Sequence, residues 1–326
     1  MKVSILVPIY GVENYIGECV RSLMEQTYED LEYIFVNDCS PDSSIAKLQE
    51  TIGEYPSRQA QVKIVHHAVN RGLGAARLTA MQHATGDCLM HVDSDDLIPP
   101  YAVTALVKKM EQTGADVVDG GYAHYEQGNV TNTFKPFKGP TEHYLKRTLC
   151  HNVESNRIWG RLYRRSLFEE HDIYPIEGID YGEDLALVSR LLYFARRATT
   201  DEVCYYYRMD NRTSYSHTIS EKANTSFLRA NRLIFDFFNA APDARQYQVA
   251  LRMGYVDLYR HARRFRLSMD NLDEMGDFWR KCFGTRLCVR LYRQKGCYRL
   301  ANFCYLNSRR IYLVCLRLFY VFRQPR

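Results

Sequence analysis

The chain has 326 residues, of which 46% are hydrophobic and 25% are charged, with a formal net charge of +5. This composition is that of a globular protein of one large or two smaller domains, and it excludes a disordered or collagen-like chain. The ten cysteines form no CxxC pair and no metal-ligand spacing, which favours reduced thiols in a cytosolic setting over a disulfide framework or a zinc site. The short apolar run at the N-terminus lacks the cleavage pattern of a signal peptide.

The first part of the chain alternates strands and helices. The nearly continuous apolar run "KVSILVPIY" is typical of a parallel strand that is covered on both faces. Further strands are predicted at 31–38, 61–67 and 86–92, and helices at 13–26, 40–55 and 72–84. Strands joined by helices predict a doubly wound, mainly parallel α/β sheet.

Polar and aromatic side chains follow each of these strands at its carboxyl end, which is where such sheets bind ligands. An aromatic ring, carboxylates and a cation together suit a nucleotide, because the ring can stack on the base and the carboxylates can bind base, ribose or metal. The candidate residues are Pro8, Tyr10, Glu13, Asn37, Asp38, Asn70, Arg77, Asp93, Asp95 and Asp96.

Three carboxylates lie within the six residues "HVDSDD", at Asp93, Asp95 and Asp96. They indicate either a solvated turn with a helix cap or a cation site. The chain has no GxGxxG after its first strand and no GxxxxGK[ST], so we expect a divalent cation to bind the phosphates instead. Asp96 is expected to cap the helix that begins near "PPYAVTALVKKM".

The segments "VPIYGVENYI", "YIFVNDCSPDSS", "NRGLGAARLTAMQHATGDCLMHVDSDD", "RIWGRLYRRSLF", "YGEDLAL" and "YYYRMDNRTSYSH" together resemble the family 2 glycosyltransferases of the GT-A fold. The resemblance covers residues 1 to about 218. Asn37 and Cys39 depart from the "DDGS" that is usual in the family, and Leu78 replaces the asparagine of "ARN".

The resemblance implies a role for several residues. Asp38 would bind the base, Asp93 the ribose, and Asp95 a Mg²⁺ or Mn²⁺ ion that bridges the two phosphates of the donor. Asp184 would be the catalytic base of an inverting enzyme and Glu183 a supporting contact to the acceptor. The alternative for these two acids is a favourable position at a helix N-terminus.

Two aromatic side chains carry weaker hypotheses. Trp159 is one of two tryptophans and either packs in the core or forms a wall for the acceptor sugar. His217 is either a surface residue or a further metal ligand, and an Arg within "YYYR" could neutralise the diphosphate.

The sequence changes character after the resemblance ends, so we expect a GT-A domain at 1–218 and a helical, basic extension at 219–326. Residues 278–326 hold twelve Lys or Arg and no Asp or Glu, interleaved with apolar residues. Their longest apolar stretch is shorter than the roughly 20 residues of a spanning helix. Three interpretations remain for this basic tail: an anionic membrane surface, which we favour, packing on the domain, or a nucleic-acid patch.

The sequence thus predicts a cytoplasmic enzyme, peripheral on the inner face of the cell membrane, with no nucleic-acid partner. It would move a hexose or N-acetylhexosamine from a nucleotide diphosphate sugar, UDP-linked, to a saccharide or lipid-linked acceptor. The alternatives are a nucleotidyltransferase that makes sugar nucleotides and a non-catalytic scaffold. The identity of the sugar depends on loop shape around the site, which the sequence does not give.

Overall fold

The computed structural model describes residues 1–150, 156–211, 220–248, 250–251 and 254. The chain divides into two compact units, one of residues 1–141 and 157–230 and the other of residues 142–156 and 231–326, and only the described residues of each are discussed. The predicted boundary at residue 218 falls in the stretch 212–219, which lies outside the described residues, and it stays a prediction.

The first unit is built on one sheet of eight strands, in which the order β3-β2-β1-β4-β7-β5-β6 is completed by β8 beside β5. The first four strands pair in parallel, β7 is antiparallel to its neighbours β4 and β5, and β8 is parallel to β5. The predicted α/β sheet of mainly parallel strands is therefore confirmed. The strands are β1 (Val3–Ile9), β2 (Leu31–Asn37), β3 (Val62–His66), β4 (Cys88–His91), β5 (Val117–Glu126), β6 (Asn129–Phe134), β7 (Arg161–Arg164) and β8 (Arg197–Arg208).

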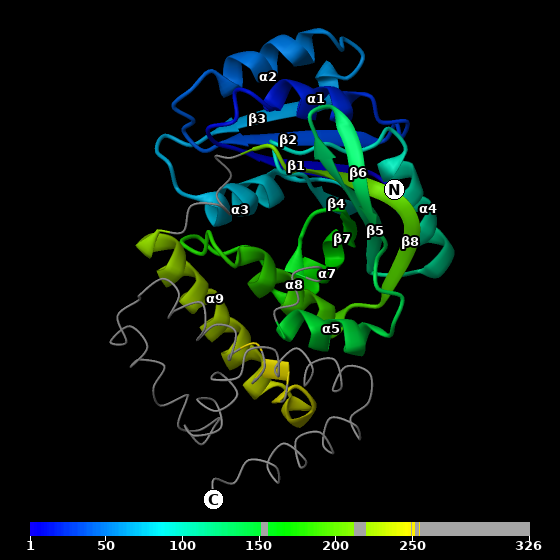
Figure 1. The fold of residues 1–326 in the computed structure, drawn as a ribbon, viewed down its shortest axis with the longest axis vertical. Helices are drawn as coiled ribbons and strands as arrows, with labels where there is room; N and C mark the ends of the chain where they lie inside the picture. Colours follow the sequence, from blue (N-terminus) through cyan, green and yellow to red (C-terminus); the bar gives the residue numbers. More distant parts are fainter. Residues whose placement is uncertain (151–155, 212–219, 249, 252–253, 255–326) are drawn as a thin grey trace, which may run out of the picture. The chain divides into compact units, whose positions relative to one another are not determined.

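Helices cover both faces of the parallel part of the sheet. Figure 1 shows α1 and α2 on one face of β1 to β3 and α3 on the other. The helices of this unit are α1 (Ile16–Met24), α2 (Ser44–Gly53), α3 (Leu73–His83), α4 (Ala102–Thr113), α7 (Arg165–His171), α8 (Glu183–Phe194) and the first half of α9 (Glu221–Ala240), with a 3₁₀ turn at Gln59–Gln61.

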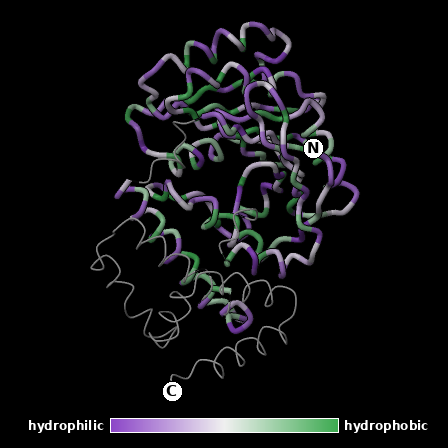
Figure 2. The backbone as a smooth tube through the Cα atoms, in the orientation of Figure 1, coloured by the Kyte–Doolittle hydropathy of each residue, from purple (hydrophilic) through white to green (hydrophobic). Residues whose placement is uncertain are grey.

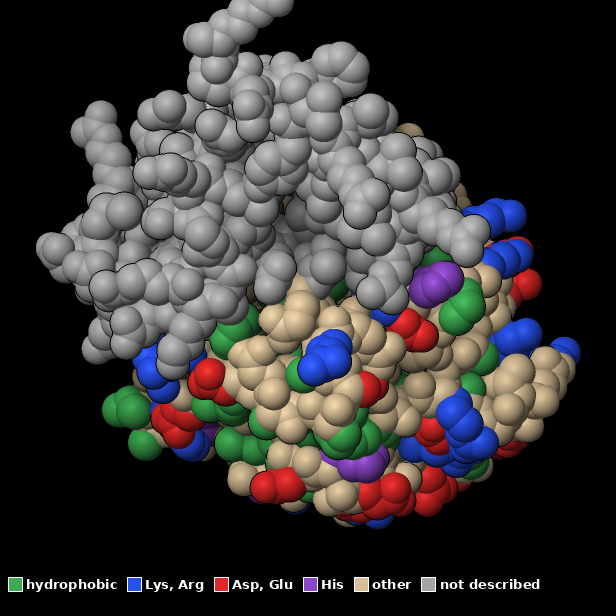
Figure 3. Space-filling model, turned by 90° about the horizontal axis from the view of Figure 1, so that it is seen from below, with side chains coloured by type: hydrophobic (Ala, Val, Ile, Leu, Met, Phe, Trp, Pro, Cys, Tyr) green, Lys and Arg blue, Asp and Glu red, His purple; other side chains and the backbone are tan. Residues whose placement is uncertain are grey.

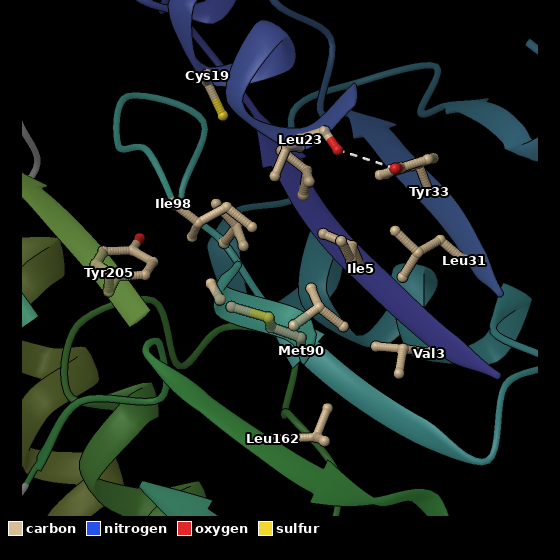
Figure 4. Close-up of a cluster of buried hydrophobic side chains, with 14 of the residues drawn as sticks. Val3, Ile5, Cys19, Leu23, Leu31, Tyr33, Met90, Ile98, Leu162 and Tyr205 are labelled. Atoms are coloured by element: carbon tan, nitrogen blue, oxygen red, sulfur yellow. Dashed lines mark hydrogen bonds between the residues drawn. The ribbon is translucent and has the colours of Figure 1, made fainter. Parts of the chain in front are cut away.

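The core lies between the strands and the helices that cover them. All seven residues of β1 are buried, and the tube in Figure 2 is correspondingly hydrophobic along the central strands. Side chains from β1, α1, β2 and β4 meet in the cluster of Figure 4, where the hydroxyl of Tyr33 donates to the carbonyl of Leu23 at 2.9 Å. This rigid sheet fixes the positions of the loops at its carboxyl edge.

The N-terminus of α3 approaches the segment 176–180 so closely that there is no room for side chains. A Cβ atom on Gly74 would lie 2.4 Å from the carbonyl oxygen of Ile176 and 2.6 Å from that of Ile179. Real Cβ atoms do not come this close, so glycine is required here for packing.

The second unit contains α5 (Thr141–Leu149), the second half of α9 and a 3₁₀ turn at Ala244–Gln246. Within it the rings of Phe238 and Tyr247 pack with centroids 5.0 Å apart. Within the described part of the chain, none of the helices has the length and apolar character that a membrane span needs. Acidic and basic side chains are interspersed on the described surface in Figure 3.

Replacement of Gly74 by alanine should destabilise the first unit by about 1–3 kcal/mol, since the new methyl group meets backbone atoms that cannot move aside freely. Gly53→Ala is the matched control, because a Cβ on this helical glycine would have nothing within 4 Å. We expect this control to keep or slightly raise stability, by less than about 1 kcal/mol. Urea unfolding midpoints measure both, and equal midpoints for the two variants would contradict the close approach.

Candidate active site

The carboxyl edge of the sheet presents an exposed ring and an exposed amide. Tyr10 directly follows β1 and is 52% exposed, while Pro8 is buried within the strand and pairs with Val36 of β2. Asn70 is exposed in the loop that leads from β3 to α3. Tyr10 and Asn70 are therefore accessible to a ligand. The side chain of Pro8 is buried, so a direct contact of this side chain with the nucleotide is not seen and stays a prediction.

Glu13 makes contacts within the protein. Its carboxylate accepts a hydrogen bond from the N–H of Ser43 at 3.1 Å, and its own N–H donates to Asp42 at 3.0 Å. Although burial opposes the shift, the hydroxyls of Ser44 and Ser40 lower the pKa of Asp42 to about 2. Glu13 and Asp42 thus join the loop after β1 to the start of α2, and a direct role of Glu13 in nucleotide binding stays a prediction.

Asp38 holds the loop between β3 and α3. Its carboxylate accepts hydrogen bonds from the N–H groups of Arg71 and Gly72, both at 2.8 Å, and lies 2.7 Å from Nδ1 of His67. The other ring nitrogen of His67 is 2.9 Å from the hydroxyl of Thr79 on α3. Asp38 is only 3% exposed, so its carboxylate is occupied by its own chain. Its predicted contact with the base stays a prediction.

Arg77 brings together the residues predicted to act on the donor and on the acceptor. Its guanidinium is 2% exposed and donates from Nη2 to Asp93 at 2.9 Å. The same nitrogen lies 3.6 Å from a carboxylate oxygen of Glu183 and 3.8 Å from one of Asp184. These residues come from α3, from the loop after β4 and from the first turn of α8, so three separate segments meet at one buried cation.

The electrostatics of this cluster favour protonation of the acids at the start of α8. Burial and the neighbouring Asp184 raise the pKa of Glu183 well above its usual value, against the opposing effect of Arg77. Burial likewise raises the pKa of Asp184, although Arg77 lowers it. One cation thus balances three carboxylates in a poorly solvated place, and perturbed carboxyls of this kind mark functional sites.

Asp184 is fixed in position by the backbone. Its Oδ2 atom accepts a hydrogen bond from the N–H of Ile158 at 3.2 Å, while Oδ1 is the atom that faces Arg77. Asp184 is also in the first turn of α8, where the positive end of the helix dipole stabilises its charge. The predicted helix N-terminal position of Asp184 therefore occurs together with a contact to Arg77 that was not predicted, and its role as the base stays a prediction.

The prediction that Asp96 caps the following helix is wrong. Asp96 is 1% exposed and accepts hydrogen bonds from the Tyr205 hydroxyl at 2.8 Å and from the Arg208 N–H at 2.7 Å. The helix α4 begins later, at Ala102, with Tyr101 as its N-cap. A buried carboxylate needs hydrogen bonds, and here β8 supplies them from more than a hundred residues away.

Asp95, the predicted metal ligand, is also held by β8 and the residues just after it. One carboxylate oxygen accepts from the amide of Asn211 at 2.7 Å, and its carbonyl accepts from Nε of Arg208 at 2.7 Å. Burial and the charge of Asp93 raise the pKa of Asp95, which is an unfavourable arrangement that a cation would relieve.

A metal ion fits this site only if the donor brings most of the ligands. The described residues contain no group of three or more His, Cys, Asp or Glu that could hold a metal ion by themselves. Mg²⁺ and Mn²⁺ accept such a site, because one or two carboxylates with diphosphate oxygens and water complete their coordination. His217, the other predicted ligand, lies outside the described residues.

Arg208 supports the acidic loop through contacts with Asp95 and Asp96. Its guanidinium is 4% exposed, binds Glu18 at 2.7 Å and lies 5.0 Å from the ring centroids of both Tyr15 and Tyr125. The sequence suggests that an arginine of this segment neutralises the diphosphate, whereas the Arg208 guanidinium binds Glu18 and the carbonyl of Asp95, and its backbone N–H binds Asp96. Its supporting role, like that of Tyr205 and Asn211, has no signal in the local sequence.

Trp159 is enclosed by other rings. Its indole stacks on Tyr205 with centroids 4.4 Å apart and on Tyr207 with centroids 5.3 Å apart, at interplanar angles of 16° and 12°. The edge of Tyr122 packs against it as well. Because stacked rings cover each other's faces, this arrangement favours the packing alternative over a wall for an acceptor sugar.

Comparison with known proteins agrees with this architecture. The model of Glycosyl transferase family 2 matches residues 4–172. From Bacillus subtilis (strain 168), the uncharacterized glycosyltransferase EpsJ is 35% identical over 215 residues, or 63% of this chain and 60% of EpsJ. The putative glycosyltransferase EpsH is 34% identical over 218 residues, or 64% of this chain and 60% of EpsH. The matched region thus spans less than two thirds of each relative.

Two solved structures share the fold. The S. aureus TarS 1–349 structure in complex with UDP-GlcNAc has a TM-score of 0.64 at 22% identity, covering 83% of this chain and 75% of that one. The mannosyltransferase PcManGT from Pyrobaculum calidifontis, in complex with GDP-Man and Mn²⁺, has a TM-score of 0.51 at 17% identity, covering 97% and 86%.

The raised pKa values of Glu183 and Asp184 predict how stability depends on pH. The folded protein then holds more protons than the unfolded chain above about pH 4, so the stability that these acids contribute is lost as the pH rises from there through their raised pKa values. Asp95 and Asp96, whose pKa values burial also raises, act in the same direction. The slope should approach about 1.4 kcal/mol per pH unit for one retained proton. Carboxyls with lowered pKa values, such as Asp42, titrate below this range.

Glu183→Gln should flatten this slope, because the variant removes one of the two acids. Asp30→Asn, at an exposed position, is the matched control and should leave the slope unchanged. Urea midpoints across this pH range, without nucleotide or metal, measure the effect. A Glu183→Gln slope as steep as that of the natural sequence would show that the pair does not carry the extra proton.

Proposed function

The chain belongs to the family 2 glycosyltransferases, as its sequence predicted, and from this premise we propose that it transfers a sugar from a nucleotide diphosphate donor to an acceptor hydroxyl with inversion. The observation that carries the proposal is that one nitrogen of Arg77 contacts Asp93 and also lies near Glu183 and Asp184. It joins a residue at the carboxyl edge of the sheet, where a nucleotide would bind, to a carboxylate suited to be a base.

In this proposal Asp184 accepts the proton of the acceptor hydroxyl. Its backbone hydrogen bond to Ile158 fixes one oxygen, and the raised pKa makes it a stronger base than an exposed aspartate. Arg77 stabilises the ionised form before the proton arrives. Glu183 lies beside it and supports the acceptor hydroxyl or shares the proton. The hydroxyl can then attack the anomeric carbon from the face opposite the departing diphosphate.

The donor side of the site is proposed to hold a nucleoside diphosphate sugar, most simply a UDP-hexose or UDP-N-acetylhexosamine. Tyr10 is exposed and can stack on the base, and Asn70 is exposed in the loop held by Asp38 at the same edge of the sheet. Asp93, oriented by Arg77, can accept from the ribose hydroxyls. The printed ligands of the structural neighbours, UDP-GlcNAc and GDP-Man, support this class of donor without choosing the base.

A divalent cation, Mn²⁺ or Mg²⁺, fits at Asp95. When bound there, it would stabilise the negative charge of the leaving diphosphate as a Lewis acid. The chain itself orients Asp95: Asn211 donates to its carboxylate, and Arg208 donates to its carbonyl.

The acceptor is proposed to be a saccharide or a lipid-linked saccharide, used at the cytoplasmic face of a membrane. The basic tail of residues 278–326 suggests this, and it lies outside the described residues. A nucleotidyltransferase is disfavoured by the family match and by the absence of a glycine-rich loop after the first strand. A non-catalytic scaffold would keep the fold but would release no nucleoside diphosphate from any nucleotide sugar in the assay below.

The test of function is release of nucleoside diphosphate from a panel of nucleotide sugars with Mn²⁺, in the presence of saccharide acceptors. Asp184→Asn should keep donor binding, since the shape is preserved, and should lower transfer on the order of 10²–10⁴-fold, because the amide cannot accept the proton. Asp30→Asn serves as the control with the same chemical change at an exposed site. Turnover of Asp184→Asn within about threefold of the natural chain would refute its role as the base.

The membrane proposal predicts that the full chain sediments with vesicles that contain anionic lipid, and less so at raised salt. The double variant Arg309→Gln with Arg310→Gln should bind roughly 30-fold more weakly, at about 1 kcal/mol for each lost cation. Lys63→Gln with Lys108→Gln, both exposed in the first unit, is the matched control. Equal sedimentation of both double variants would assign the tail to packing.

A further inference from the structure

The start of α9 contacts the segment that leads into α8. The hydroxyl of Ser226 accepts hydrogen bonds from the N–H groups of Asp180 at 2.7 Å and Tyr181 at 2.9 Å. It also lies 3.1 Å from the carbonyl oxygen of Tyr181, to which it donates. Ser226 is 3% exposed, and its hydroxyl satisfies three backbone groups of the buried Asp180 and the half-buried Tyr181.

Asp180 connects the same segment to α3. Its carboxylate is 4% exposed, accepts from the N–H of Gly74 at 3.2 Å and lies 3.2 Å from the ammonium of Lys222 on α9. Gly74 is three residues before Arg77. Asp180 is therefore positioned by α9 and in turn positions the helix that carries the buried arginine.

The residue at the start of α8 packs directly on α9. Gly182 has a φ of 85°, and a Cβ on it would lie 2.7 Å from the ring of Phe227 and 3.3 Å from the methyl group of Ala230. No side chain caps α8, whose N-cap is Gly182 itself. The position of its first turn, with Glu183 and Asp184, therefore depends on what packs against the residues just before it.

We propose that Ser226 is a positioning residue for the catalytic base, acting through the backbone of residues 180–182 to set the distance between Asp184 and Arg77. The inference deepens the proposed function and rests on it. Lys222 assists by holding the carboxylate of Asp180. The first three turns of α9 thus belong to the active site, although they lie beyond the residues that the family model matches.

The physical reason is that a base acts only at hydrogen-bond distance from the proton it removes. A displacement of about 1 Å costs on the order of 10²-fold in rate. In Ser226→Ala two N–H groups and one carbonyl lose their partner, so the segment must shift or admit water. The nucleotide contacts at Tyr10, Asn70 and Asp93 lie on other elements, and donor binding should persist.

The first experiment compares Ser226→Ala with the natural chain in the full-length protein. We expect kcat for transfer to fall about 10- to 100-fold, while KM for the donor changes less than about twofold. Ile52→Val is the matched control: it removes one buried methylene group from α2 and destabilises by about 0.5–1.5 kcal/mol without touching this segment. An equal fall of kcat in Ile52→Val, or an unchanged kcat in Ser226→Ala, would overturn the proposal.

A second variant, at an exposed side chain, tests the proposal without a risk to folding. A second measurement, hydrogen exchange, tests it without an assay of turnover. Lys222→Met alters a side chain that is 69% exposed, and it should lower kcat a few-fold with donor KM unchanged, whereas its neighbour Glu221→Gln should have no effect. Hydrogen exchange of the amides at 180–186 should be faster in Ser226→Ala than in the natural chain or Ile52→Val.

The two readouts separate this inference from the proposed function. If the natural chain transfers no sugar, the proposed function fails while the exchange result still reports whether Ser226 holds the segment. If the chain is active and exchange at 180–186 is the same in Ser226→Ala as in the natural chain, the positioning role is wrong and the function stands.

Discussion

The buried guanidinium of Arg77 is the constraint on which the site depends. A cation that is 2% exposed must be paired, and the pairing here takes carboxylates from two other segments of the chain. The acids in turn tolerate burial because the cation is there. Removal of either partner would leave an uncompensated charge, so the relative positions of α3, the loop after β4 and the start of α8 are specified together.

A second set of polar side chains contacts the acidic loop and comes from β8 and the residues just after it. Tyr205 and Arg208 satisfy Asp96, while Asn211 holds Asp95, so the two neighbouring acids are given different environments. Asp96 is committed to the protein, whereas Asp95 is only half-buried. The clustered carboxylates of the motif therefore have separate tasks, one structural and the other suited to a cation.

The sequence predicted what depends on local pattern or on a motif. The parallel strands followed from apolar runs, and the proximity of Arg77 and Asp93 followed from the carboxyl-edge rule. The contact of Arg77 with Asp184 was not predicted. The sequence did not predict contacts that only tertiary structure creates. Asp96 precedes a helix and was interpreted as its cap, and for Trp159 the sequence did not choose between core packing and a sugar-binding wall. Nothing near Ser226 in the sequence indicates its contact with residues 180 and 181. In each case the contacting residues lie 45 or more positions away in the chain.

The dependence of Asp96 on β8 has a consequence for how the chain is made. A ribosome completes β1 to β4 long before it reaches Tyr205 and Arg208, 109 and 112 residues after Asp96. Until then, the nascent sheet carries an acid whose burial has no compensation, so its acidic loop cannot close in the final form. Residues 4–172, the portion matched by the family model, therefore do not contain the two groups that satisfy Asp96.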